Sequence, residues 1–318
     1  MSDTADLSIV IPAYKARYLD AALGSISEQQ DQGFRVHIGD DASPDDLTAV
    51  CRRWQDRVPL VYHRFEHNLG GRDLVAQWHR CIALGDQPWV WLFSDDDVME
   101  PGCVRAWREA QGREPQADVF HFDVLRIDGE GQPLRDEPAF ADRLSARRFL
   151  LQRLRFELSS YAPDYVFRRS AFQAAGGFQS FPLAWCSDDA TWIKLAARGG
   201  GIRAVRGARV HWRLSDANIS QYANTRLASL KLEAWVQFLE WLDGHLAQLP
   251  LEPGDPDDTK LRGAARYWLY QQAGNAGIRF AGLPRVALAR RLGKLQQHSL
   301  PGALLRMLRS DWQLACAR

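Results

Sequence analysis

The sequence of 318 residues has few of the features that mark disulfide-bonded or membrane-spanning proteins. Its five cysteines are scattered, odd in number and without a Cys-x-x-Cys pair, which is typical of reduced thiols in a cytoplasmic protein. No stretch reaches the roughly 18 consecutive apolar residues that span a bilayer. Asp3 and Asp6 precede only a short apolar stretch, so no signal peptide is expected either. We therefore expect a protein that is soluble or peripheral to a membrane.

Two common phosphate-binding motifs are also missing. No Gly-x-Gly-x-x-Gly follows the first predicted strand and no Gly-Lys-Ser/Thr loop occurs, which argues against dinucleotide enzymes and P-loop NTPases. Forty Lys and Arg residues balance thirty-nine Asp and Glu residues, and the net charge of +1 gives no overall field that would favour nucleic acid. The C-terminal segment is an exception, because residues 279–318 hold eight basic residues and a single acid, Asp311.

The first hundred residues alternate between two kinds of apolar pattern. Short apolar runs bounded by turn residues predict strands, and the segments between them place apolar residues at helical spacing. The predicted strands cover residues 7–12, 34–39, 60–64 and 89–94. Because strands that alternate with helices form a mostly parallel sheet covered on both faces, the sequence indicates an α/β three-layer sandwich.

The pattern changes after residue 100. Residues 118–127 alternate and meet a turn at Asp128 and Gly129, which predicts a hairpin or an extension of the sheet. Residues 133–145 are charged and are expected to form a loop. From about residue 223 the apolar residues follow a helical stripe, so the C-terminal region is predicted to be helical.

An unusual cluster of acids follows the fourth predicted strand. The apolar run that begins at Trp89 leads directly into Asp95, Asp96 and Asp97. Ligands of open α/β sheets gather at the carboxyl ends of strands, and a divalent cation would relieve the repulsion among three adjacent carboxylates. The cluster therefore predicts a site for Mg²⁺ or Mn²⁺ and a phosphate group. The alternative is a solvated acidic turn or a helix N-cap.

Two further acidic pairs fall at predicted element boundaries. Asp40 and Asp41 follow the second strand, and Asp188 and Asp189 precede a helix. A carboxylate after the second strand is placed to accept hydrogen bonds from a ribose or a base, and one outside the metal shell could serve as a general base. Taken singly, each pair is also explained as a turn or a helix cap.

Six segments in a fixed order resemble the motifs of family 2 inverting glycosyltransferases of GT-A fold. The resemblance covers roughly residues 6–220, and it implies a GT-A nucleotide-sugar-binding and catalytic domain over residues 1–220 with a helical extension over residues 221–318. The segments are Leu7 to Tyr14, His37 to Asp45, Asn68 to Gly70, Phe93 to Asp97, Val166 to Ser170 with Gly176 to Phe178, and Ser187 to Asp189 with Trp192.

The resemblance also assigns roles around the nucleotide. It implies that Pro12, Ala13 and Tyr14 flank the base and that Asp41 contacts it. Arg72 lies where a basic residue can help to hold the donor.

The remaining roles concern the metal and the reaction. The resemblance aligns Asp96 and Asp97 with paired acids that touch ribose and metal, while an alternative frame pairs Asp95 with Asp97. In either frame Asp97 is the expected metal ligand. It aligns Asp189 with the catalytic base. His211 is a candidate for binding metal or phosphate, although a packed or surface imidazole is the common alternative. Arg213, two residues later, is a comparable candidate.

These assignments predict a metal-dependent transferase with Mn²⁺ or Mg²⁺ as cofactor. It would move a sugar from a nucleotide diphosphate sugar, a UDP-sugar by resemblance, to a glycan or a lipid-linked glycan. The alternative is a non-catalytic nucleotide- or glycan-binding module that retains the GT-A fold. The basic, leucine-containing C-terminal segment could rest on the inner face of a membrane, form a homo-oligomer interface or face solvent.

Overall fold

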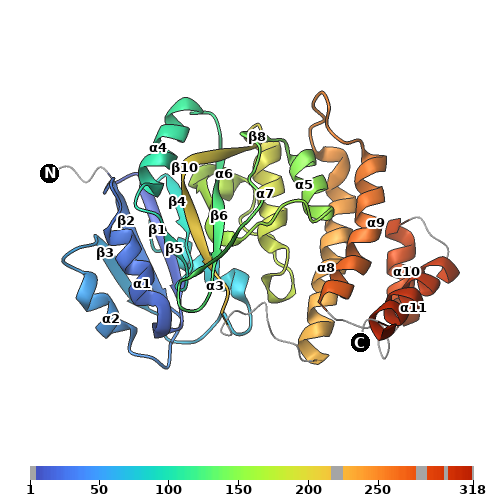
Figure 1. The fold of residues 1–318 in the computed structure, drawn as a ribbon, viewed down its shortest axis with the longest axis horizontal. Helices are drawn as coiled ribbons and strands as arrows, with labels where there is room; N and C mark the ends of the chain where they lie inside the picture. The colour runs from blue at the N-terminus through green and yellow to red at the C-terminus, as the bar shows by residue number, and fades with distance from the viewer. Residues whose placement is uncertain (1–4, 216–224, 277–284, 297–299, 317–318) are drawn as a thin grey trace.

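The computed structural model describes residues 5–215, 225–276, 285–296 and 300–316. Its ten strands form one mixed sheet (Figure 1). The order along the sheet is β3-β2-β1-β4-β9-β6-β10-β5, with β7 beside β6 and β8 beside β10. The strands are β1 (Leu7–Ala13), β2 (Phe34–Asp40), β3 (Leu60–Arg64), β4 (Trp89–Leu92), β5 (Val98–Met99), β6 (Val119–Ile127), β7 (Pro133–Asp136), β8 (Arg143–Leu144), β9 (Tyr165–Arg168) and β10 (Ile202–Arg213).

The first four strands lie next to one another and run parallel, as the sequence predicted. β1 is the central member of this group, because it pairs with β2 on one side and with β4 on the other. The register places Ala13 at the end of β1 opposite Asp40 at the end of β2. The loops that leave β1, β2 and β4 therefore meet at the carboxyl edge of the sheet.

The other strands extend the sheet with mixed directions. β9 runs antiparallel to β4 and β6, whereas β10 runs parallel to β6. The predicted hairpin is confirmed, since β6 pairs with β7 in antiparallel register. The predicted loop over residues 133–145 is wrong in part, because it contains β7 and β8. All four residues of β7 are exposed, so this edge strand has no buried face that would produce an apolar alternation.

Helices cover both faces of the sheet and give the three-layer sandwich that the sequence predicted (Figure 1). One apolar cluster joins the sheet to α1 (Ala16–Ser27), α2 (Leu47–Trp54) and α4 (Cys103–Arg113). A second cluster joins the opposite face to α3 (Leu74–Ile82), α5 (Ala146–Leu154), α6 (Arg169–Ala174) and α7 (Ser187–Arg198). Buried aromatic side chains such as Trp91 and Trp192 fill these layers.

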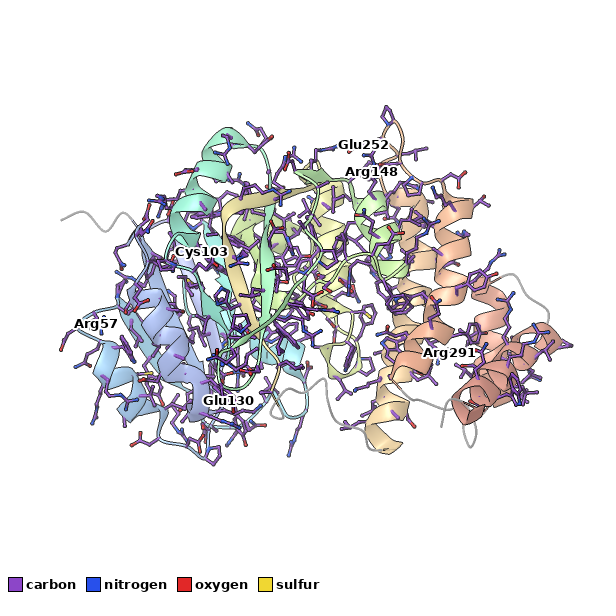
Figure 2. The ribbon with its side chains drawn as sticks, in the orientation of Figure 1. Arg57, Cys103, Glu130, Arg148, Glu252 and Arg291 are labelled. Atoms are coloured by element: carbon purple, nitrogen blue, oxygen red, sulfur yellow. The ribbon has the colours of Figure 1, made fainter. Side chains whose placement is uncertain are left out.

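The C-terminal helices pack against the second of these layers. They are α8 (Thr225–His245), α9 (Asp258–Asn275), α10 (Arg285–Gln296) and α11 (Leu300–Cys316). Phe238 of α8 meets Phe181 at 6.1 Å between ring centroids, and Arg291 of α10, labelled in Figure 2, binds Glu233 and Glu240 of α8. The predicted helical region is confirmed, whereas the predicted boundary between residues 220 and 221 lies outside the described residues. No described helix is both long and apolar enough to cross a bilayer.

Candidate active site

A pocket of about 560 Å³ lies at the carboxyl edge of the sheet and reaches the C-terminal helices. Pro12 at the end of β1 and Asp96 after β4 form part of its wall. Another part comes from Asp189 in the first turn of α7. Trp268 and Gln272 of α9 complete the wall, so the helical region contributes directly to the pocket.

Asp95 links the loops that follow β1 and β4. Its Oδ2 atom accepts hydrogen bonds from the backbone amides of Tyr14, at 2.9 Å, and Lys15, at 3.2 Å. The two loops are thereby held together at the wall of the pocket. Asp95 lines this pocket beside Asp96. Burial raises the pKa of both carboxyls. The pKa of Asp96 rises to about 7, because the charge of Asp95 adds to the effect of burial.

Asp97 points into the protein and is 1% exposed. Its Oδ1 atom accepts a hydrogen bond of 2.8 Å from the backbone amide of Arg213, while its buried Oδ2 atom has no hydrogen-bond partner among the described residues. Burial, together with the neighbouring charge of Asp96, raises the pKa of Asp97 well above its ordinary value. The guanidinium of Arg213 also donates a hydrogen bond of 2.7 Å to the carbonyl of Asp96 and so stabilises the acidic loop.

The acidic loop offers carboxylates to a hard divalent cation without forming a complete metal cage. Within the described ranges, no three His, Cys, Asp or Glu side chains converge on a preformed metal cage. However, Asp95 and Asp96 face the pocket, and the buried Oδ2 atom of Asp97 has no donor. Mg²⁺ commonly takes one or two carboxylates and completes its shell with water and substrate phosphates. These residues therefore suit a cation that arrives with a diphosphate.

Asp41 organises the loop that precedes α3 and is 4% exposed. It accepts hydrogen bonds from the amides of Leu69 and Gly70, at 2.7 and 2.8 Å, from the side chain of Asn68 at 2.9 Å, and from Arg80. A Cβ atom on Gly70 would lie 2.8 Å from Asp41 Oδ2, so this approach requires glycine. Asp41 is not among the described residues that line the pocket, and its contact with a base stays a prediction.

Asp189 forms a bidentate ion pair with Arg153 of α5. The two bonds join Nε to Oδ1 at 3.0 Å and Nη2 to Oδ2 at 2.9 Å. A third bond, of 2.6 Å, connects Arg153 Nη1 to the carbonyl of Leu158 and fixes the guanidinium. Because this fork matches the carboxylate in one orientation, Arg153 sets the direction in which Asp189 faces the pocket.

Asp188, the neighbouring residue, lines the same pocket but has no salt bridge with a described residue within 4 Å. The carboxyl of Asp188 accepts a hydrogen bond of 2.9 Å from the backbone amide of Asp189. Burial and the adjacent charge of Asp189 raise the pKa of Asp188 to about 7. Asp188 and Asp189 thus have different surroundings, because only Asp189 is bound by the guanidinium of Arg153.

Several predicted site residues are not brought to the pocket wall. His211 Nε2 lies 3.2 Å from Glu100 Oε1, and His211 is not among the described lining residues. The reason is the alternation of β10, because neighbouring side chains of a strand point to opposite faces and Trp212 is the residue that lines the pocket. Ala13 is buried in β1, whereas the side chains of Tyr14 and Arg72 are exposed.

Other residues of the pocket have no sequence motif. Arg153 lies on a helix that the sequence pattern did not indicate, although its long basic side chain is the partner that a buried carboxylate requires. Tyr161 and Trp212 stack with ring centroids 4.4 Å apart and both line the pocket. Only the fold brings these aromatic residues together.

The sheet and helices define the class of the protein, an α/β sandwich of the GT-A type. Over 97% of this chain and 89% of the other, the structure superposes on that of S. aureus TarS 1-349 in complex with UDP-GlcNAc, with a TM-score of 0.70 and 13% identity. The mannosyltransferase PcManGT from Pyrobaculum calidifontis, in complex with GDP-Man and Mn²⁺, gives a TM-score of 0.51 at 14% identity over 96% of this chain and 87% of the other. These likenesses show the fold.

Sequence relationships then identify the family. The family model described as Glycosyl transferase family 2 matches residues 8–174, and the chain belongs to this family. The glycosyltransferase GlyG of Streptococcus pneumoniae serotype 4 is 23% identical over 52% of this chain, and the match spans about half of GlyG, 53%. The validoxylamine A glucosyltransferase of Streptomyces hygroscopicus is 38% identical over 22% of this chain and 17% of that protein.

Proposed function

We propose that the chain transfers a sugar from a nucleotide diphosphate sugar, and specifically from a UDP-sugar, to a hydroxyl group of a glycan or lipid-linked glycan. One observation carries this proposal. A single pocket contains the acidic end of β4 and the paired acids of α7, Asp188 and Asp189. The complexes of TarS with UDP-GlcNAc and UDP, and of PcManGT with GDP-Man and Mn²⁺, support a nucleotide-sugar donor.

The donor would lie across the carboxyl ends of β1 and β4. In this proposal the segment from Pro12 to Tyr14 flanks the base, and Lys15, which lines the pocket, faces the diphosphate. Asp41 holds the neighbouring loop in position, and Arg72 approaches the donor from that loop. Mn²⁺ or Mg²⁺, held by Asp95 to Asp97, would neutralise the charge of the leaving diphosphate.

Asp189 would act as the general base of an inverting displacement. It removes the proton from the acceptor hydroxyl while that oxygen forms a bond to the anomeric carbon. The bond from this carbon to the diphosphate oxygen breaks, and the diphosphate leaves with the electron pair. General-base assistance of this kind contributes about 10²–10⁴ in rate. Arg153 keeps Asp189 oriented during the proton transfer.

The acceptor would occupy the aromatic part of the pocket. Trp185, Trp212 and Trp268 come from the loop before α7, from β10 and from α9, and all three line the pocket. Flat aromatic faces can pack against the apolar face of a sugar ring, and Gln272 adds a group that can bond to hydroxyls. We therefore assign acceptor recognition to the helical region over residues 221–318 together with these tryptophans.

The test combines donor binding with turnover. Thermal stabilisation by UDP- and GDP-sugars, measured with MnCl₂ or with EDTA, identifies the donor, and nucleotide release in the presence of acceptor glycans measures transfer. We expect Asp189→Asn to bind donor normally and to lose transfer. Asp142→Asn, whose side chain is 93% exposed, serves as the control.

Two outcomes would contradict the proposal. Wild-type protein that binds a UDP-sugar but neither transfers nor hydrolyses it would be the non-catalytic module. Asp189→Asn with wild-type turnover would remove Asp189 from the role of base.

A further inference from the structure

The outer face of α11 exposes large apolar side chains. Leu305, Leu308 and Trp312 are 50%, 51% and 67% exposed, although Ala303 and Met307 of the same helix are fully buried. Spacings of three, four and seven residues place the exposed side chains on one face of the helix. We call Leu305, Leu308 and Trp312 the α11 stripe.

The buried leucines of the neighbouring helix have a different role. Leu288 and Leu292 of α10 are 7% and 0% exposed and belong to the core. They hold α10 in place, and the α11 stripe is left at the surface. It lies at the end of the molecule farthest from β3 (Figure 1). None of its residues lines the pocket.

Two arginines of α11 accompany the α11 stripe. Arg309 is exposed and lies on the same helix face, four residues after Leu305 and three before Trp312. Arg306 lies 5.7 Å from the ring of Tyr267 on α9, and that tyrosine is 62% exposed. The sequences of α10 and α11 include several arginines but only one acid, Asp311. The face therefore combines apolar side chains with the cation of Arg309, and the two helices carry an excess of positive charge.

We propose that the α11 stripe and Arg309 form a docking surface for an anionic lipid bilayer. A helix with Trp and Leu on one face and Arg beside them lies in the plane of the interface, where its apolar side chains enter the acyl boundary and its cations meet lipid phosphates. A symmetric contact between two copies of this face would bring like-charged arginines together, which disfavours self-association. This inference is independent of the proposed transfer activity.

Vesicle flotation of the full chain tests the proposal. Wild-type protein is expected to float with vesicles of phosphatidylcholine and phosphatidylglycerol but not with phosphatidylcholine alone, and to dissociate as salt concentration rises. Combined Leu305→Ser, Leu308→Ser and Trp312→Ser should lower the partition coefficient at least about tenfold. Arg309→Gln should lower it about fivefold.

Matched controls separate docking from loss of structure. Leu134→Ser changes an equally exposed leucine, 50%, on β7, and Arg113→Gln changes an exposed arginine on α4, and both should float like the wild type. Unfolding temperatures establish that each variant is folded. Equal binding to neutral vesicles, or unchanged flotation of the triple variant, would overturn the proposal. So would a wild-type dimer in light scattering that the triple substitution dissociates.

Discussion

Replacing Arg153 by lysine is a direct test of how the pocket orients Asp189. The substitution keeps a positive charge but removes the planar fork that makes two bonds to the carboxylate, at 2.9 and 3.0 Å. It also removes the bond of 2.6 Å to the carbonyl of Leu158, which fixes the guanidinium. Asp189 should then adopt several orientations, and the fraction that faces the acceptor hydroxyl should fall.

The structure sets the expected magnitude. The side chains of Arg153 and Asp189 are 26% and 10% exposed, so the pair lies between a surface ion pair, worth about 0–1 kcal/mol, and a buried one, whose disruption costs about 3–5 kcal/mol. Because lysine can restore one bond, we expect a loss of about 2 kcal/mol in the free energy of unfolding. A displacement of the base by about 1 Å should lower kcat about 10²-fold.

The assay is steady-state transfer at a series of donor concentrations and pH values, with denaturant unfolding in parallel. Donor KM should stay unchanged, since the hydrogen bonds of Arg153 go to Asp189 and to the carbonyl of Leu158. The control is Arg148→Lys, on the same helix, since Arg148 (labelled in Figure 2) forms an ion pair of 3.1 Å with Asp255 and does not line the pocket. Wild-type kcat and pH profile in Arg153→Lys would refute the positioning role. An equal loss in Arg148→Lys would also refute it.

Two further predictions concern pH and backbone packing. Burial raises the pKa of Asp96 and Asp188 to about 7 from 3.8, so protons compete with a cation at Asp96 below that pH. The contribution of these two carboxyls to the stability of the unliganded fold is lost as pH rises from about 4 to 7. Thermal stabilisation by MnCl₂ with UDP should therefore increase from about pH 6 to about pH 8, and a flat response would contradict this assignment. Gly70→Ala should destabilise the protein by about 1–3 kcal/mol in denaturant unfolding, because the new Cβ atom meets Asp41 at 2.8 Å. Gly112→Ala on α4, where a Cβ atom meets nothing within 4 Å, should cost nothing, and equal losses would exclude a steric cause at Gly70.

The sheet was predictable because its central strands carry the signal in their own residues. β1 and β4 are buried on both faces, so each reads as an apolar run, and β2 alternates apolar residues with Arg35 and His37 before it ends at Asp40. The short edge strands could not be found this way, because β7 is held by pairing with β6 and not by burial of its own side chains. Pairing between distant segments leaves no local pattern.

The residues of the candidate site likewise fall into those that the sequence predicted and those that it did not. Asp96 and Asp189 follow or begin predicted elements, and the carboxyl edge of the sheet brings them to one pocket. Arg153, Tyr161 and Gln272 reach that pocket from segments that carry no motif. Their contribution depends on how α5 and α9 pack on α7, which no residue pattern within either helix specifies.

The orientations of Asp95, Asp96 and Asp97 illustrate why a sequence motif does not determine which of its acids bind a metal. After β4 the chain no longer alternates like a strand, and each carboxylate direction depends on a different partner. Asp95 turns towards the amides of Tyr14 and Lys15, and Asp97 turns inward to the amide of Arg213. Asp95 and Asp96 both line the pocket, whereas Asp97 is not among its described lining residues. Asp95 and Asp97 therefore fix the loop from two sides through amides of distant segments, and such tertiary contacts cannot be read from three adjacent acids in a sequence.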